Sequence, residues 1–319
     1  MMMIEKIRNS KKIQIVLIVV FAILAAISLL QGCKNAIEVS QDFQWDAAKA
    51  FTLKINPYIE SLSPTGALDA YDFETYYLQM EANQFPSLLM LLIPYTFLPP
   101  LIARYAWLVS NLCFTGMIIW LLRKTFLKDI QLRPFCLLIL FMISGTPYRN
   151  QLGVGQHTLF SFMFFLIAVY ACQKNEERKD PKKFKLSIAA ALAVSYFKYT
   201  LTAPLALYFL YKKRWREFVA SILVHVIMTF FAAFWLGTSV IDMIILPLKV
   251  SSALAGEGGI DLGALFGGSP ISYGLAVVMM CLLLWIVCKM PKGEDMMIFS
   301  LLTLVSLIIT YHRTYDFWV

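Results

Sequence analysis

The chain has 319 residues, of which 59% are hydrophobic and only 15% are charged, and its mean hydropathy is +0.68. So few charged residues cannot cover a water-soluble globule of this length, so lipid must solvate much of the chain. The net charge of +8 would suit nucleic acid, but the basic residues stand in short clusters beside apolar runs, as membrane topology signals do. We therefore expect an all-α polytopic membrane protein without a nucleic-acid partner.

The first apolar run, 13–33, follows four basic residues and is long enough to span a bilayer. It ends in Leu30-Gln31-Gly32-Cys33, which resembles the box before a lipidated cysteine, so a lipoprotein signal is the alternative interpretation. Gln31 is unusual in such a box, and many apolar segments follow. We interpret 13–33 as an uncleaved first transmembrane helix.

Eight more apolar segments follow. They are 86–103, 104–122, 134–147, 157–173, 186–211, 217–237, 271–288 and 296–311. Five basic clusters hold 20 of the 28 Lys and Arg residues. They are 5–12, 123–133, 174–185, 212–216 and 289–292. The positive-inside rule places all five in the cytoplasm, so we expect a multi-pass protein of the cell (inner) membrane with a cytoplasmic N-terminus.

This topology constrains two segments. Segment 86–103 contains four prolines, which predict a partly embedded or re-entrant piece, with 104–122 as the true crossing. Segment 186–211 must enter the membrane and return, so we expect two short helices that meet near Lys198. A single tilted span is the alternative there, and it would invert the topology of everything that follows.

Two outward loops are long. Residues 34–85 are rich in Tyr, Phe and acidic residues, which predicts short amphipathic helices on the membrane surface. Residues 238–270 end in glycine-rich sequence, which predicts a mobile loop that acts as a substrate gate. No Gly-Lys-Ser/Thr follows these glycines, which excludes a phosphate-binding P-loop. The six cysteines show no CxxC and no metal-ligand spacing, and we expect neither a metal nor a cofactor.

The first candidate site residues are in the loop after the first span. Asp42 and Asp46 are four residues apart, so they would share one face of a helix at the mouth of a membrane cavity. A carboxylate in that place can act as a general base on an acceptor hydroxyl. A solvated or helix-capping acid is the alternative for each of them.

Further polar residues follow on the same outward side. Arg149, Gln156 and His157 are in the segment between two apolar runs, where each polar group is costly without a partner. Lys198 stands alone between apolar runs and could pair with a phosphate. Helix caps and inter-helix hydrogen bonds are the alternative for the first group, and a snorkelling lysine is the alternative for Lys198.

The last candidates leave the final span on the outward side. His312 and Arg313 precede Asp316, a combination that suits phosphate binding or proton handling, with a plain interfacial cluster as the alternative. His225 is interpreted as a satisfied helix residue. All four groups of candidates fall on one face under a topology chosen only from Lys and Arg positions, and this agreement favours an outward site.

The sequence resembles the GT-C superfamily of membrane glycosyltransferases, most closely glycosyltransferase family 87, the polyprenol-phosphate-mannose-dependent mannosyltransferases. The matching residues are Asp42-Phe43, Ala47-Ala48, Asn56-Pro57-Tyr58, Phe85-Pro86, Leu98-Pro99-Pro100, Gly155-Gln156, Lys198, Arg214-Trp215-Arg216, His312-Arg313 and Tyr315-Asp316. They cover essentially the whole chain in the right order. The departures are Trp45 in place of a usual Tyr and Ser87 in place of a second proline.

The resemblance implies a hexose, mannose first of all, handed from a polyprenyl phosphate to a glycan or glycolipid acceptor on the extracytoplasmic face. Asp42 would be the general base of an inverting transfer. The donor phosphate would be held by His312, Arg313 and Lys198. The sugar and acceptor pocket would include Asp46, Arg149, Gln156 and Tyr58.

The same resemblance implies one GT-C-type transmembrane domain over residues 1–319. The family has further spans after the His-Arg motif, so the chain is expected to be shortened at its C-terminus. A transporter or lipid-carrier flippase is the competing function, although it should show inverted repeats and polar groups near mid-membrane. An inactive assembly subunit of the same fold is the third.

Overall fold

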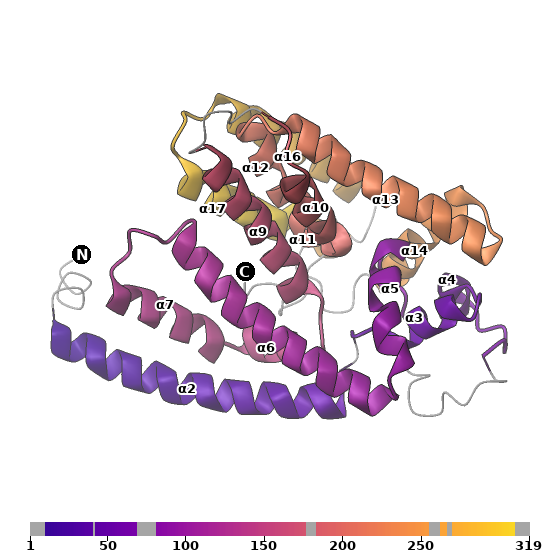
Figure 1. The fold of residues 1–319 in the computed structure, drawn as a ribbon, viewed down its shortest axis with the longest axis horizontal. Coiled ribbons are helices and arrows are strands. Elements are labelled where there is room, and N and C mark those ends of the chain that lie inside the picture. Colours follow the sequence, from indigo (N-terminus) through magenta and orange to yellow (C-terminus); the bar gives the residue numbers. More distant parts are fainter. Residues whose placement is uncertain are drawn as a thin grey trace.

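The computed structural model describes residues 10–40, 42–68, 81–176, 183–254, 262–266 and 270–309, and these residues form helices and no strand (Figure 1). Five helices in these ranges are long and apolar enough to cross a membrane. They are Lys11–Glu38, Pro100–Lys124, Thr158–Glu176, Leu186–Leu205 and Trp215–Leu236. The predicted all-α polytopic class is confirmed.

The first helix, α2 (Lys11–Glu38), runs through Cys33 to Glu38, so the following loop begins later than residue 34. Most of α2 faces outward from the protein, and its buried positions are the small residues Ala25, Ser28, Gly32 and Ala36. These residues let α2 approach α7 (Leu132–Ser144) and α8 (Thr146–Gly153) closely, as small residues do between membrane helices.

Two short helices, α3 (Trp45–Thr52) and α4 (Pro57–Leu62), lie in the first loop, where short helices were predicted. Their expected surface position is wrong for α3, because six of its eight residues are buried. The alanines of α3 make most of its circumference small and apolar. It therefore packs inside the fold against α5 (Pro86–Leu92) and the 3₁₀-helix η2 (Ile93–Phe97).

The proline-rich segment 86–103 forms short helices, and its predicted partly embedded or re-entrant position stays a prediction. Its end differs from the expected residue 103. After α5 and η2 the chain is extended at Leu98, and α6 (Pro100–Lys124) begins at Pro100 instead of residue 104. A proline suits the first turn of a helix, since its missing N–H would have no partner there. The crossing helix is therefore longer than expected.

The central helix is α9 (Thr158–Glu176), which packs against α6 and α10 (Leu186–Ser195) and carries the fully buried Phe162 and Phe165. After α10 come the 3₁₀-helix η3 (Tyr196–Lys198), α11 (Tyr199–Leu205) and α12 (Leu207–Tyr211). The predicted interruption near Lys198 is confirmed. How often 186–211 crosses the membrane stays a prediction.

The prediction of a glycine-rich loop over 238–270 is wrong for much of that range. Residues Val240–Leu254 form helix α14, and Leu262–Phe266 form the short α15. Ser239 begins α14 with a reciprocal cap: its Oγ donates to Asp242 Oδ2 at 2.8 Å and accepts from Asp242 N at 3.0 Å. The glycines at 256, 258 and 259 lie in the part of the loop that is not described.

Three long helices near the end of the chain pack around α11 and α12. They are α13 (Trp215–Leu236), α16 (Pro270–Lys289) and α17 (Asp295–Ile309). At one end of the bundle, Lys212 pairs with Glu176 at 2.9 Å and Asp295 at 3.1 Å. Arg214 donates to the Lys183 carbonyl at 3.1 Å. The Tyr211 hydroxyl donates to the Pro291 carbonyl at 2.7 Å. The basic clusters 174–185, 212–216 and 289–292 therefore lie together at one end, and the membrane side of that end stays a prediction.

Candidate active site

The Asp42 turn, described at residues 39–40 and 42–44, lies between α2 and α3 in the chain. Its backbone is fixed on the end of α8, because Ser40 N donates to the Gly153 carbonyl at 3.3 Å and Asp42 N to the Val154 carbonyl at 2.8 Å. Asp42 precedes α3, whose first residue is Trp45. The expectation that Asp42 and Asp46 share one helix face is therefore wrong, since a turn with a left-handed residue at Gln44 separates them.

Gln156 joins the Asp42 turn to the segment before α9. Its Nε2 donates to Asp42 Oδ2 at 3.0 Å, and its Oε1 accepts from the His157 backbone N–H at 2.9 Å. A backbone N–H can only donate, so the orientation of the Gln156 amide is determined. Gln151 Nε2 also donates to the Gln156 carbonyl at 2.9 Å. The structure thus brings together Asp42 and Gln156, two of the predicted site residues.

An aromatic floor lies beneath this pair. The Trp107 indole N–H donates to the Gly155 carbonyl at 2.7 Å, and the Phe43 ring stacks on Trp107 with centroids 5.3 Å apart. Gly155 has φ +72, and a Cβ there would lie 2.6 Å from Ser40 Oγ. Only glycine fits this close approach. Sequence reasoning did not single out Trp107, which is one apolar residue among many in α6.

Lys198 lies on the other side of the 156–161 segment. Its side chain is buried, and its backbone N–H donates to Ser161 Oγ at 3.0 Å. Ser161 N in turn donates to the His157 carbonyl at 3.0 Å, so Lys198 is linked to the turn that contains His157. The Lys198 backbone is therefore bonded to the segment that follows Gln156, and the role of its side chain stays a prediction.

His157 is fully buried, and its ring lies 5.2 Å from Trp107. Burial, together with the nearby charge of Lys198, lowers the pKa of His157 to about 3, so the imidazole is neutral. The Phe43 backbone approaches the ring and opposes this lowering of the pKa, but neither ring nitrogen has hydrogen-bond geometry with a described residue. The sequence hint was a histidine directly before an apolar span, but no role was assigned to it.

Asp46 is also buried, with 1% of its surface exposed, and neither carboxylate oxygen is hydrogen-bonded to a described residue. Burial raises the pKa of Asp46 to about 8, against the opposing charge of Arg104. Arg104 also donates to the Ile37 carbonyl at 3.0 Å, which caps the end of α2. Asp46 is therefore largely protonated at neutral pH, unlike a resting general base.

The other predicted site residues have different surroundings. Arg149 donates to Gln31 Oε1 of α2 at 2.8 Å, and the buried Tyr58 hydroxyl donates to the Gln84 carbonyl at 2.9 Å. Both side chains thus hold neighbouring segments in place. His312 and Arg313 belong to residues 310–319, whose placement is not described.

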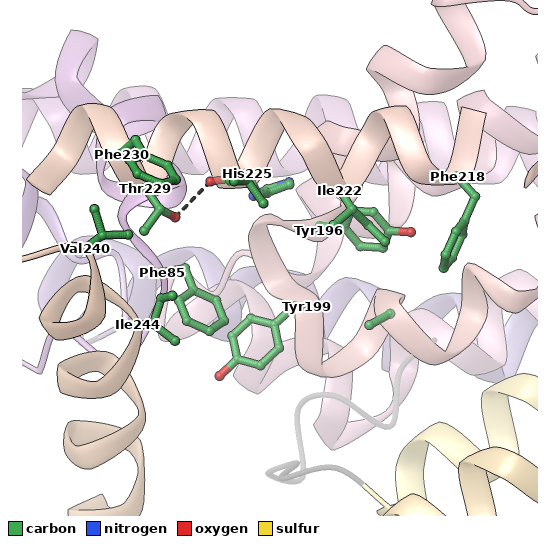
Figure 2. A pocket seen from close by; sticks show the side chains of 12 residues that line it. Phe85, Tyr196, Tyr199, Phe218, Ile222, His225, Thr229, Phe230, Val240 and Ile244 are labelled. Atoms are coloured by element: carbon green, nitrogen blue, oxygen red, sulfur yellow. Dashed lines mark hydrogen bonds between the residues drawn. The ribbon is translucent and has the colours of Figure 1, made fainter. Parts of the chain in front are cut away.

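An apolar groove of about 380 Å³ lies between α13, α14 and the η3–α11 segment (Figure 2). Figure 2 shows Phe85 and Tyr199 next to each other on the side facing α14, and their ring centroids are 4.6 Å apart. Tyr196 and Tyr199, which flank Lys198 in sequence, both line the groove. The groove and the Lys198 side chain therefore belong to the same turn of the chain.

His225 also lines the groove, but its ring is satisfied, as predicted. One ring nitrogen lies 2.9 Å from Ser87 Oγ and the other 2.7 Å from the Ala193 carbonyl. These bonds link α13 to α5 and α10. His225 is therefore a structural residue of the groove wall.

Comparison with known proteins gives one family. A family model described as glycosyltransferase family 87 matches residues 86–311, which include Gln156 and Lys198. Asp42, Asp46 and Tyr58 precede the matched range, and His312 and Arg313 follow it. No curated protein and no solved structure matches the chain. Because the match covers well over half of the sequence, the chain belongs to glycosyltransferase family 87 and is a membrane glycosyltransferase.

Proposed function

We propose that this enzyme transfers a hexose, mannose first of all, from a polyprenyl-phosphate donor to a hydroxyl of an extracytoplasmic glycan or glycolipid. The observation that carries the proposal is that an acid, a buried lysine and an apolar groove are connected through the short segment 156–161. Asp42 is bonded to Gln156 on one side, Lys198 is linked to Ser161 on the other, and an apolar groove begins at the same turn as Lys198. A base, a phosphate partner and a lipid site are the three parts that such a transfer needs.

In this proposal Asp42 is the general base. The acceptor oxygen forms a bond to the anomeric carbon while the bond from that carbon to the phosphate oxygen breaks, with inversion. The acceptor proton goes to Asp42, and the electron pair of the broken bond remains on the phosphate. The hydrogen bond from Gln156 Nε2 holds the carboxylate in one orientation, which is what a base aimed at one hydroxyl requires.

Lys198 is proposed to hold the donor phosphate, together with His312 and Arg313. Its ammonium group is buried, and a charge in a low-dielectric site interacts with a developing phosphate charge more strongly than one in water. This argument favours the leaving phosphate as a group that Lys198 contacts.

The groove is proposed to hold the first part of the polyprenyl chain. Its lining is almost entirely aliphatic and aromatic, and α13, which forms one wall, exposes most of its length on the outside of the bundle. A phosphate at Lys198 would leave its lipid chain beside Tyr196 and Tyr199, at the groove. The rest of the chain then extends into the membrane.

The remaining assignments follow from this arrangement. Asp46, Arg149 and Tyr58 are proposed to shape the sugar and acceptor pocket by holding the loop and helix ends around Asp42. Residues 1–319 are proposed to form one GT-C-type domain of the inner membrane, with the 34–85 and 238–270 segments and the site on the extracytoplasmic side. Buried charges at one end of a helical bundle are typical of such functional sites.

The test is transfer of labelled mannose by the purified full-length protein in detergent, with polyprenyl-phosphate mannose and, in parallel, a nucleotide sugar. We expect transfer only from the lipid-linked donor. Asp42→Asn, which keeps the size of the side chain, should lower kcat by about 10²–10⁴-fold, the usual contribution of a general base. Asp242→Asn, at the exposed cap of α14, is the control. Transfer from the nucleotide sugar, or an unchanged rate for Asp42→Asn, would refute the proposal.

A further inference from the structure

His157 is an unusual buried residue of this site. Its side chain is 1% exposed, yet both ring nitrogens are without a hydrogen bond among the described residues. Buried polar atoms are almost always paired, and leaving one unpaired costs stability. The other buried histidine, His225, has a partner for each ring nitrogen. The open hydrogen-bonding capacity of His157 therefore points to a ligand.

The position of His157 limits which part of the substrate its side chain can contact. Its backbone N–H orients Gln156, which binds Asp42, and its carbonyl accepts from Ser161, which binds the Lys198 backbone. His157 thus lies between the proposed base and the proposed phosphate partner. In an in-line displacement the sugar lies between the attacking hydroxyl and the leaving phosphate. A side chain in this interval is therefore beside the transferred sugar.

The protonation state of the imidazole limits which chemical groups it can bind. Lys198 and burial keep the ring neutral, so one nitrogen carries a proton and the other is an acceptor. A phosphate monoanion offers mainly acceptors, whereas a sugar hydroxyl both donates and accepts. A neutral imidazole whose acceptor nitrogen has no hydrogen bond to a described residue is therefore better matched to a hydroxyl group than to phosphate.

We propose that His157 is a specificity-determining residue that hydrogen-bonds a hydroxyl of the transferred hexose. The inference rests on the proposed lipid-linked sugar transfer and adds the residue that recognises the sugar itself. Its ring meets Trp107, whose indole N–H is anchored on Gly155, in a tilted contact that restricts the direction of the ring edges. A ring held in this way distinguishes a hexose with a hydroxyl at one position from a hexose without it.

The experiment is a double-mutant cycle between the protein and the sugar. Wild type and His157→Leu are assayed with a series of polyprenyl-phosphate donors in which one sugar hydroxyl at a time is replaced by hydrogen. In wild type we expect one of these donors to lose about 10- to 100-fold in kcat/KM, the loss expected for one buried hydrogen bond left unpaired. In His157→Leu, kcat/KM should be the same for this deoxy donor as for the unmodified donor, because the side chain that recognises the hydroxyl is gone.

Two amide substitutions at His157 show which ring nitrogen binds the sugar hydroxyl, because only the amide in the right place should restore discrimination between the donors. His157→Asn places its amide near the Nδ1 position, and His157→Gln reaches toward the Nε2 position. One of the two should recover discrimination against the sensitive donor. If every donor is slowed equally by His157→Leu, the residue acts only on the position of Gln156, and the proposal is overturned while lipid-linked transfer stands. Wild type that transfers from no lipid-linked donor would overturn both.

A second measurement needs no substrate. Because the free imidazole is buried without partners, His157→Leu should raise the melting temperature of the unliganded protein while it lowers activity. His225→Leu is the matched control, and it should lower the melting temperature, since Ser87 and the Ala193 carbonyl lose their partner. If both substitutions lower the melting temperature equally, His157 is an ordinary packed residue and the inference fails.

Discussion

Replacing Gly155 with alanine should disturb the site through the Asp42 turn. Gly155 has φ +72, a conformation that costs an L-residue about 1–2 kcal/mol. The new Cβ would lie 2.6 Å from Ser40 Oγ, and relieving such an overlap in a packed interior costs about 1–3 kcal/mol. The expected loss of stability is therefore about 2–5 kcal/mol, and the displaced residue belongs to the turn that carries Asp42.

The assay combines melting in detergent with sugar transfer. Gly155→Ala should lower both the melting temperature and kcat. Ser40→Ala in the same chain removes the overlapping Oγ and leaves the next contacts at 3.4 Å, so the double variant should recover the steric part of the loss. Gly116→Ala is the control, because a Cβ there meets nothing within 4 Å inside α6 and should stabilise the helix slightly. Equal melting of Gly155→Ala and Gly116→Ala would refute the reasoning.

Three further predictions concern other parts of the molecule. Gly153→Ala places a Cβ 2.8 Å from Asn35 Cβ on α2, so it should lower the melting temperature, and a variant that melts like wild type would show that α2 can shift freely. Asp46 has a pKa of about 8 when folded and about 4 when unfolded, so the folded state binds the extra proton and stability should fall as pH rises from about 4 to 8. Asp46→Asn should flatten that slope in melting curves recorded across this range, and an unchanged slope would contradict the burial argument. Lys212→Met leaves Glu176 and Asp295 without their shared cation and should cost about 1–2 kcal/mol, measured by melting against Lys213→Met.

Local signals in the sequence predicted much of the fold. The apolar segments became helices because each is long enough to satisfy its own backbone hydrogen bonds, which lipid cannot do. The prolines on either side of Leu98 interrupt the helices there, because proline lacks the backbone N–H that a helix interior needs. The glycine-rich loop 238–270 was overpredicted, because the glycines cluster near its end while Ser239 and Asp242 cap a regular helix before them.

The candidate site was predictable in part. The positions of Lys and Arg predict that Asp42, Gln156 and Lys198 lie on one face, and the structure joins Asp42 to Gln156 by a hydrogen bond. The partner of each side chain was not predictable. The link from Asp42 to Gln156 joins residues 114 positions apart, and no local pattern specifies such a pair.

By itself, the sequence determined the solvent of this protein and the positions of most of its long helices, because hydropathy acts locally along the chain, and it predicts the side on which the polar groups collect. Only the tertiary structure decided which polar groups are paired. It gave the side chains of Tyr58 and His225 hydrogen-bond partners, and it left the carboxylate of Asp46 and the ring nitrogens of His157 without a hydrogen bond to a described residue. The physical reason is that desolvation depends on every neighbour at once, and those neighbours come from segments far apart in the chain.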